Sequence, residues 1–344
     1  MAAPIDLVEQ GYVPDWITRV GIRRLLKKRL NQEKRKFKAE HALQSLINEM
    51  NNSALAINTQ DANKQHYEVP TEFYERTLGI HKKYSCGYFN THVTNLSTAE
   101  EEMLSISCER AGLVDGMDIL ELGCGWGSLT LWMALHYPNS KIVAVSNSST
   151  QKEFIDATTV QRNLNNIEII TSDMNDFSTA TKFDRVVSIE MFEHMRNHQL
   201  LFQRIAQWLK PEGKLFFHIF CHKNIPYFFE TKGKSDWMAE HFFTGGLMPS
   251  YDLPLAIESD LNLENRWIVN GKHYAKTNRA WLDQLDSNQD QILNILKKSK
   301  DPTPEIIQMN RWRIFFMACE ELFAYNQGKE WHVGHYLFGN KKGN

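Results

Sequence analysis

The stretch ILELGCGWGSL, residues 119–129, decides the fold because an apolar run leads into three closely spaced glycines and then into an apolar helical pattern. A short apolar run that ends at glycine is typical of a buried strand. Gly123, Gly125 and Gly127 let the backbone turn tightly and approach a ligand closely, at the end of a sheet where such ligands bind. The stretch therefore predicts a strand, a ligand-binding loop and a helix.

The glycine spacing separates two kinds of loop. The dinucleotide loop reads GxGxxG and is followed by an acidic residue about 20 positions later. Here the third glycine comes one residue early, and the run KIVAVS (141–146) has no carboxylate after it. Glu121, directly before the glycines, fits the E/DxGxGxG loop of enzymes that use S-adenosylmethionine. Ser146 or Asn147 would then bind the ribose hydroxyls, because both side chains donate and accept hydrogen bonds.

Short runs rich in β-branched residues follow this loop and alternate with helical patterns. The runs are KIVAVS (141–146), IEIITSD (167–173), FDRVVSIE (183–190) and KLFFHIF (214–220), and the helical patterns span 128–137, 150–163 and 199–208. Strands that alternate with helices imply right-handed crossovers and a parallel sheet covered on both faces. The expected fold class is therefore α/β, a Rossmann-like, doubly wound sheet.

The rest of the chain predicts additions to this core. After Phe220 the alternation stops, and residues 223–265 are rich in aromatic residues, Gly and Pro, which indicates an inserted cap. Helical patterns follow at 277–298 and 303–326, and a last strand is expected within 331–338. We expect a helical section that covers the active site (1–100), a core (101–222), a cap with helices (223–300) and a C-terminal helix and strand that complete the core (301–344).

The segment 23–38 holds nine Lys and Arg residues and one acidic residue, Glu33. Ile22, Leu25, Leu26 and Leu30 lie close to one helical stripe, which predicts a basic amphipathic helix. Such a helix could lie on an anionic membrane surface. The alternative, which we favour, is a solvated helix packed over the main domain.

Composition narrows the classes of partner. The chain has 41 acidic and 39 basic residues, so its overall charge does not point to nucleic acid. No apolar run reaches the ~18–20 residues that span a bilayer, and the first residues lack the pattern of a secretory signal. The five cysteines are scattered without ligand spacing, so we expect no metal site, no disulfide framework and a cytoplasmic location. A homodimer is one expectation for the assembly.

The segment SIEMFEHMRN (188–197) carries the best-placed titratable groups, Glu190, Glu193 and His194, at the end of the fourth strand of the core. Two carboxylates and an imidazole beside a sulfonium could hold a cationic amine and take the proton that it must lose before its lone pair attacks. The alternative is an ion-paired turn with no chemical role. Asp173, after the third strand, could accept a hydrogen bond from an adenine amino group or could cap a helix.

The chain resembles the coclaurine N-methyltransferase group within the cyclopropane fatty acid synthase-like methyltransferases. The resemblance rests on ordered matches from about residue 5 to the end: HYEVP, YSCGYF, ILELGCGWGSLTL, VSNSSTQKEFI, SIEMFEHMRN, FFTGGLMPS, GKHYAKTNRAWL and EELFAYNQGKEWHVGHYLF. It implies a class I methyltransferase fold and S-adenosylmethionine as cofactor. The cofactor contacts that it implies are Tyr67, Ser85, Gly123, Gly125, Asn147, Gln151 and Asp173. The residues that it implies for binding the amine and handling its proton are Glu68, Glu190, Glu193 and His194.

The resemblance also carries a feature of the lipid-modifying members. Cys86, Glu193, His218 and Tyr274 stand where those enzymes hold a bicarbonate base, whereas Glu190 stands where they have Gly. The leading hypothesis is N-methylation of a small, aromatic or heterocyclic amine. The alternative is C-methylation or cyclopropanation of an unsaturated lipid acceptor with bicarbonate as base. From a different class, the chain could be a cofactor-binding module without catalysis, which the intact Glu and His cluster argues against.

Overall fold

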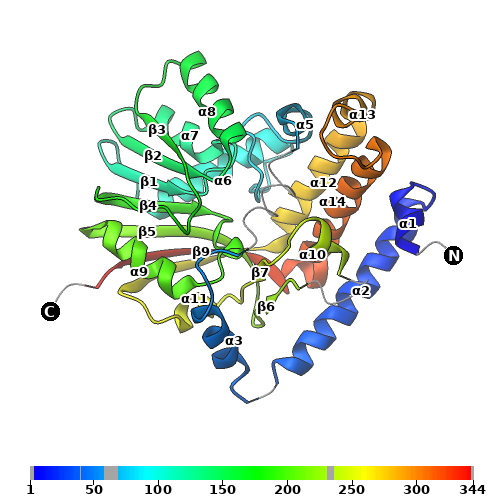
Figure 1. The fold of residues 1–344 in the computed structure, drawn as a ribbon, viewed down its shortest axis with the longest axis horizontal. Helices are drawn as coiled ribbons and strands as arrows, with labels where there is room; N and C mark the ends of the chain where they lie inside the picture. The colour runs from blue at the N-terminus through cyan, green and yellow to red at the C-terminus, as the bar shows by residue number, and fades with distance from the viewer. Residues whose placement is uncertain (1–3, 39, 58–68, 231–235, 342–344) are drawn as a thin grey trace.

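The computed structural model describes residues 4–38, 40–57, 69–230 and 236–341 (Figure 1). Seven strands form the central sheet in the order β3-β2-β1-β4-β5-β9-β8. They are β1 (Asp118–Leu122), β2 (Lys141–Ser146), β3 (Ile167–Thr171), β4 (Phe183–Ile189), β5 (Leu209–His222), β8 (Leu261–Val269) and β9 (Trp331–Asn340). The strands β1 to β5 are parallel, and β9 runs antiparallel to both of its neighbours. The sheet is therefore mixed, with an antiparallel end added to a doubly wound core.

The short strands β6 (Tyr227–Phe228) and β7 (Leu247–Met248) pair with each other beside the main sheet. The helices are α1 (Pro4–Glu9), α2 (Asp15–Lys36), α3 (Ala42–Asn51), α5 (Thr71–Thr77), α6 (Leu96–Ala111), α7 (Ser128–His136), α8 (Ser149–Gln161), α9 (His198–Trp208), α10 (Trp237–His241), α11 (Leu253–Ala256), α12 (Gly271–Ser287), α13 (Gln289–Leu296) and α14 (Glu305–Gly328), with a 3₁₀ turn, η1, at Phe192–His194. No described helix combines the length and the apolar composition that crossing a bilayer requires.

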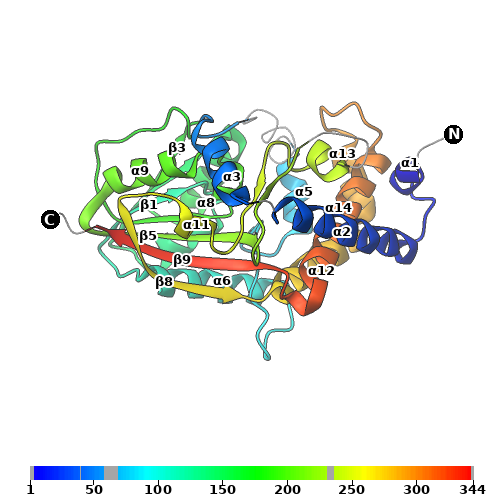
Figure 2. The same cartoon turned by 90° about the horizontal axis from the view of Figure 1, so that it is seen from below.

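Both faces of the sheet are covered, because alternate residues of each strand point to opposite sides. Ile119 of β1 and Phe216 of β5 pack with the buried residues of α6 and α7. Leu120 and Phe217, their neighbours along the strands, pack with α9 and α3 on the other side. Figure 2 shows α9 and α3 on one side of the sheet and α6 on the other. This arrangement confirms the α/β class that the alternation of strands and helices predicts.

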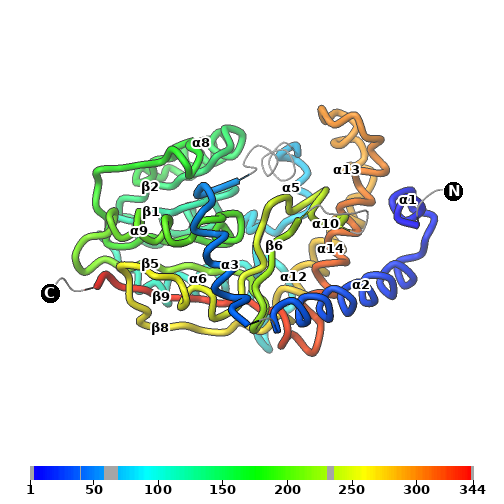
Figure 3. The backbone as a smooth tube through the Cα atoms, turned by 60° about the horizontal axis from the view of Figure 1, so that its bottom comes forward, coloured from blue at the N-terminus to red at the C-terminus, as the bar shows by residue number. Residues whose placement is uncertain are grey.

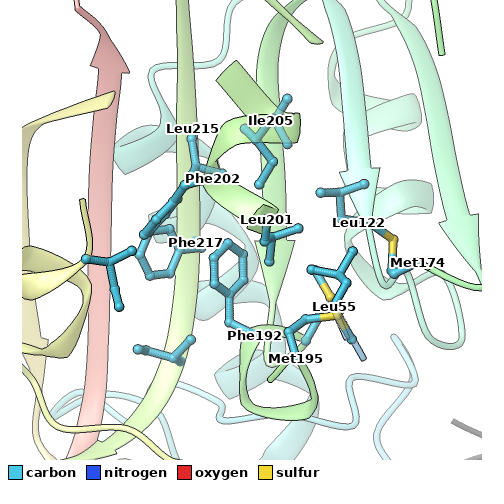
Figure 4. Packing of buried hydrophobic residues seen from close by; sticks show 14 of the residues in the cluster. Leu55, Leu122, Met174, Phe192, Met195, Leu201, Phe202, Ile205, Leu215 and Phe217 are labelled. Carbon is cyan, nitrogen blue, oxygen red and sulfur yellow. The ribbon is translucent and has the colours of Figure 1, made fainter. Parts of the chain in front are cut away.

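The packing beneath α9 fixes the turn that follows β4. Figure 4 shows Phe192 of η1 inserted among Leu201, Phe202 and Phe217. The ring of Phe192 stacks on that of Phe217 with 4.5 Å between the centroids. Burial of a Phe side chain contributes roughly 1.5–3 kcal/mol. Phe192 therefore anchors the segment that carries Glu190, Glu193 and His194.

A helical group made of α2, α5, α12, α13 and α14 lies beside the sheet and shares one core (Figure 1). Figure 3 shows α2 running along the outside of this group. The guanidinium of Arg19 pairs with Glu320 and Glu321 of α14, at 2.8 and 3.0 Å. Leu30 is buried, whereas Leu25 is 55% exposed. The basic helix α2 is therefore packed against α14 and the rest of this helical group. Its contact with a membrane surface stays a prediction.

One strand was not anticipated. β8 (Leu261–Val269) lies partly within the segment that the sequence assigns to the cap, and it forms the edge of the main sheet. Its partner, β9, follows about sixty residues later along the chain. The rest of the predicted cap is short: it holds β6, α10, β7 and α11.

Candidate active site

A single deep pocket contains most of the residues singled out from the sequence. It lies where the parallel strands β1 to β4 end, and it is closed on the other side by residues of α12 and α14. The predicted residues that line it are Ser85, Gly123, Gly125, Asn147, Gln151, Asp173, Glu190, His194 and Tyr274. Tyr67 and Glu68 lie outside the described residues. Cys86, Glu193 and His218 sit behind the pocket wall, as described below.

The glycine loop leaves room for a ligand at one position and none at its neighbours. All three glycines have positive φ, between 54° and 77°. A Cβ on Gly123 would lie 2.6 Å from Cγ of Met191, and one on Gly127 would lie 2.7 Å from Cγ1 of Ile155. A Cβ on Gly125 would meet no atom within 4 Å, so its open side faces the pocket.

Three buried donor atoms surround this loop without a partner among the residues that the structure describes: Trp126 Nε1, Ser128 Oγ and Gln151 Nε2. All three residues line the pocket. A buried donor without a partner costs about 1–3 kcal/mol, so such groups indicate a missing ligand. The oxygens and nitrogens of a ribose, an adenine and an amino acid carboxylate would satisfy them. The residues of this end of the pocket therefore fit S-adenosylmethionine.

Two polar residues at the strand ends already have local partners. Asp173 Oδ1 accepts hydrogen bonds from the backbone N–H and the side-chain Nδ2 of Asn175, at 2.8 and 3.0 Å. These bonds hold the loop after β3, so the carboxylate shapes the pocket edge. Ser146 donates to Gln151 Oε1 at 2.7 Å, which orients the Gln151 amide with its Nε2 left over.

Glu190 is the centre of the site. Its Oε1 accepts hydrogen bonds from the backbone N–H of Cys86, at 3.1 Å, and from Nε2 of His218, at 3.0 Å. Its Oε2 accepts the hydroxyl hydrogen of Tyr274 at 2.5 Å. The side chain is 9% exposed, on the pocket wall. Three donors from β5, α12 and the segment before α6 thus converge on one carboxylate.

The backbone of Glu190 is also unusual. Its φ is 51°, in the left-handed region that residues other than glycine adopt at a cost of roughly 1–2 kcal/mol. Strain of this kind persists where the surroundings over-determine the conformation, and it is concentrated at functional sites. The three hydrogen bonds to the carboxylate supply that constraint here.

Burial raises the pKa of Glu190 to about 7, and the ammonium of Lys83, the Tyr274 hydroxyl and the Cys86 N–H oppose that rise. Lys83 is itself buried, which lowers its pKa, and its Nζ donates to Ser85 Oγ. The carboxyl therefore changes its charge near neutral pH, as a general base requires. Lys83 was not identified from the sequence, although a lysine directly before YSCGYF was a visible signal.

Glu193 and His194 point in different directions. Glu193 is completely buried, and its Oε1 accepts the backbone N–H of Phe220 at 2.7 Å. Burial, and then the charge of Glu190, raise the pKa of Glu193 well above the usual range, which favours its neutral form. His194, the next residue, lines the pocket with its ring 4.7 Å from that of Phe243. A catalytic role for Glu193 stays a prediction, and its position favours support of the loop.

The residues that the resemblance implies for a bicarbonate site lie around the carboxylate of Glu190. His218 and Tyr274 donate to the Glu190 carboxylate, and Cys86 does so through its backbone N–H. The Cys86 thiol donates to the carbonyl of Gly87 at 3.2 Å, and burial raises its pKa well above the ordinary value. It is therefore a neutral thiol in the wall of the site. Among the described residues no cluster of three His, Cys, Asp or Glu side chains could hold a metal ion.

Aromatic rings form a large part of the pocket wall. The rings come from β5, the cap, α12 and α14: Phe220, Phe229, Phe243, Trp281, Phe315 and Phe323. From the aromatic-rich segment 223–265, Phe229 and Phe243 line the pocket, whereas Phe242 stacks on Phe315 with 4.3 Å between centroids. The helical periodicity of α12 and α14 does not by itself assign these rings to the pocket, because they follow an ordinary helical pattern.

Comparison with known proteins gives a consistent result. The family described as Mycolic acid cyclopropane synthetase matches residues 56–333. The chain is 37% identical over 342 residues to (S)-coclaurine N-methyltransferase of Thalictrum flavum subsp. glaucum, an alignment that covers 97% of this chain and 94% of that protein. It is 36% identical to pavine N-methyltransferase of the same plant over 290 residues, 83% of this chain and 80% of the relative.

A solved structure gives the same result. The crystal structure of coclaurine N-methyltransferase bound to N-methylheliamine and SAH superimposes with a TM-score of 0.91, at 36% identity and with 97% of both chains covered. The seven-stranded sheet and the N-terminal helices are therefore features that this chain shares with that structure.

Proposed function

Because the chain belongs to the mycolic acid cyclopropane synthetase family and is an S-adenosylmethionine-dependent methyltransferase, we propose that it methylates the nitrogen of a small aromatic or heterocyclic amine. The relatives that support this proposal are named as N-methyltransferases of coclaurine and pavine. At identities of 36–37% the acceptor of this chain need not be either compound.

The observation that carries the proposal is the Glu190 carboxylate. It shares the pocket wall with Gly125 and Gln151 of the cofactor site and with the aromatic residues Phe243 and Phe323. The Tyr274 hydroxyl that donates to Glu190 belongs to a ring that stacks on Phe323. An amine whose ring packs against these aromatic side chains would therefore have its nitrogen near a carboxylate. The charge of the carboxylate attracts an ammonium, and the faces of the aromatic rings bind a cation through cation–π interactions.

S-adenosylmethionine supplies, when bound, a methyl group on a positively charged sulfur. An amine that arrives protonated has no lone pair to offer, so the site must take its proton first. Glu190, with a pKa of about 7, is suited to accept that proton, and His194 is the second candidate on the pocket wall. The aromatic walls exclude water and fix the direction of the nitrogen, and positioning of this kind supplies much of the barrier reduction.

The lipid alternative is less well supported. A bicarbonate base would need the donors of Cys86, His218 and Tyr274, and all three already bind the Glu190 carboxylate. Adding a second anion beside this carboxylate would cost electrostatic energy. We therefore propose that Glu190 is a base built into the chain and that bicarbonate is not required.

The test is a methyl-transfer screen, read by product mass, over secondary aromatic and heterocyclic amines, polyamines and phospholipid vesicles. The active-site variant is Glu190→Gln, and the matched control is Glu264→Gln, which removes a carboxylate that pairs with Lys214 at the far edge of the sheet. We expect methylated amine from the wild-type protein and the control, and little from Glu190→Gln. A methyl or methylene group found on the acyl chains, with no amine product, would overturn the proposal.

A further inference from the structure

Two buried histidines lie side by side behind Glu190. His218 of β5 and His335 of β9 are direct register partners in the sheet, and neither has any exposed surface. They belong to the face that α6 covers, on the side of the carboxylate away from the pocket. A buried pair of imidazoles in an otherwise apolar layer needs an explanation, because each polar nitrogen must find a partner.

The histidines form the middle of a continuous chain of hydrogen bonds. An Nη atom of Arg110, at the end of α6, lies 2.9 Å from Nδ1 of His335. Nε2 of His335 lies 3.0 Å from Nδ1 of His218, and Nε2 of His218 lies 3.0 Å from Oε1 of Glu190. The Arg110 guanidinium also lies over the ring of Trp267 on β8, 5.2 Å from its centroid.

Only one arrangement of hydrogens satisfies this chain. A guanidinium has donors and no acceptor, so Nδ1 of His335 must accept and its hydrogen must sit on Nε2. Nδ1 of His218 then accepts in turn, and the hydrogen of His218 sits on Nε2, where it points to Glu190. Burial lowers the pKa of both histidines well below the ordinary value, so each carries one hydrogen. Arg110 thus sets the direction of every bond in the chain.

We propose that Arg110 and His335 are positioning residues that fix His218 in the tautomer whose Nε2–H donates to Glu190, and that they thereby keep this carboxylate ready as a base. In the opposite tautomer, His218 would present an acceptor to Glu190 and would favour the protonated, inactive carboxyl. The inference deepens the proposed function, on which it rests for the role of Glu190 in the reaction.

The chain does not carry protons out of the site. Arg110 cannot accept a proton, so the row of imidazoles is closed at that end. A proton taken by Glu190 must therefore leave through the pocket. This row of hydrogen bonds therefore affects Glu190 only by fixing which nitrogen of His218 carries the hydrogen and by the positive charge at its Arg110 end.

Other groups also act on the charge of Glu190. The titratable and charged groups around the Glu190 carboxylate, taken from all the elements that pack against it, are Lys83, Cys86, Glu193, His218, Tyr274 and Cys319. Arg110 and His335 differ from these groups because their hydrogen bonds lead to His218 and not to Glu190, and neither is among the groups that shift the pKa of Glu190 directly. Their effect must therefore pass through His218, and it can be measured separately.

The experiment uses the protein without any acceptor, so it does not depend on the identity of the amine. Nitrogen NMR of ¹⁵N-histidine protein reports the tautomers of His218 and His335. Carbon NMR of the glutamate carboxyls reports the titration of Glu190, whose signal is assigned by its loss in Glu190→Gln. The variants are Arg110→Met, Arg110→Lys and His335→Gln.

The control is Arg185→Met. Arg185 donates to the carbonyls of Ala111 and Gly112 at the end of the same helix, and it does not belong to the chain. Thermal unfolding and S-adenosylmethionine binding check that each variant is folded.

In the wild-type protein and in Arg185→Met we expect both histidines to carry hydrogen on Nε2. In Arg110→Met we expect a mixture of His218 tautomers and a pKa of Glu190 higher by about one unit. Arg110→Lys, which keeps a charged donor, should retain most of the wild-type behaviour. His218 with hydrogen on Nδ1 in the wild-type protein, or an unchanged Glu190 titration in folded Arg110→Met and His335→Gln, would overturn the proposal. If no amine is methylated but the tautomers follow this pattern, the positioning role stands and only the reaction must be revised.

Discussion

Tyr274→Phe removes one hydrogen-bond donor from the base, Glu190, and leaves the rest of the site in place. The lost hydroxyl donates to Glu190 Oε2 at 2.5 Å. The ring itself stacks on Phe323 with 4.4 Å between centroids and also contacts Trp281, and phenylalanine keeps both contacts. The substitution therefore tests the hydrogen bond with little change in packing.

The size of the effect follows from the charge of the acceptor. A hydrogen bond to a charged group contributes about 1.5–3 kcal/mol, and about 1.4 kcal/mol corresponds to one pKa unit. Loss of the donor disfavours the carboxylate, so the pKa of Glu190 rises from about 7 by roughly one to two units. At pH 7 the ionised fraction would fall from about half to about 1–10%, and the rate would fall roughly five- to fiftyfold.

The assay is the pH dependence of kcat/KM for one amine, compared between variants so that the titration of the amine itself cancels. The acidic limb of the profile should move to higher pH in Tyr274→Phe, and the two proteins should approach each other at alkaline pH. Tyr227→Phe is the matched control, because Tyr227 is a buried tyrosine that accepts a hydrogen bond from Trp331 outside the pocket. An equal loss at every pH, or a limb that does not move, would refute the reasoning.

Three further substitutions test separate parts of the site. Gly125→Ala should weaken S-adenosylmethionine binding, measured by calorimetry, and should lower the free energy of unfolding by only about 1–2 kcal/mol. Gly123→Ala should also clash with Met191 within the fold and should therefore unfold at a clearly lower denaturant concentration. Equal stabilities for the two variants would contradict this. Glu193→Gln should keep methyl transfer within a few-fold at every pH, because burial already favours the neutral form of this acid. A loss as large as that of Glu190→Gln would make Glu193 catalytic instead. Lys83→Met should move the acidic limb to higher pH, because the ammonium favours the charged form of Glu190; a shift to lower pH in the same profile would show that Lys83 acts otherwise.

The features that the sequence predicts best are those encoded over a few neighbouring residues. The glycine loop and the short β-branched runs are local patterns, and they define β1 to β5 and the cofactor end of the pocket. The edge strand β8 is different. Its sequence, LNLENRWIV, mixes five apolar with four polar residues without a regular alternation, and the strand is stabilised by pairing with β9. Nothing near it in the chain signals that pairing.

The site shows the same division. The sequence places Glu190, Glu193 and His194 together, but it does not decide which of them faces the pocket. That depends on the insertion of Phe192 into the core, which turns Glu193 inward and His194 outward. The bond between Arg110 and His335 joins residues 225 positions apart, and only the folded chain brings them together.

The most direct test of the central claim is the rate of methyl transfer to an amine in buffer freed of bicarbonate, for the wild-type protein and for Glu190→Gln. If Glu190 is the base, the wild-type rate should not change when bicarbonate is removed or restored. The Glu190→Gln rate should be lower by roughly 10²–10⁴-fold, the contribution typical of a general base. A wild-type rate that requires bicarbonate, or a Glu190→Gln rate within about tenfold of the wild type, would contradict the account.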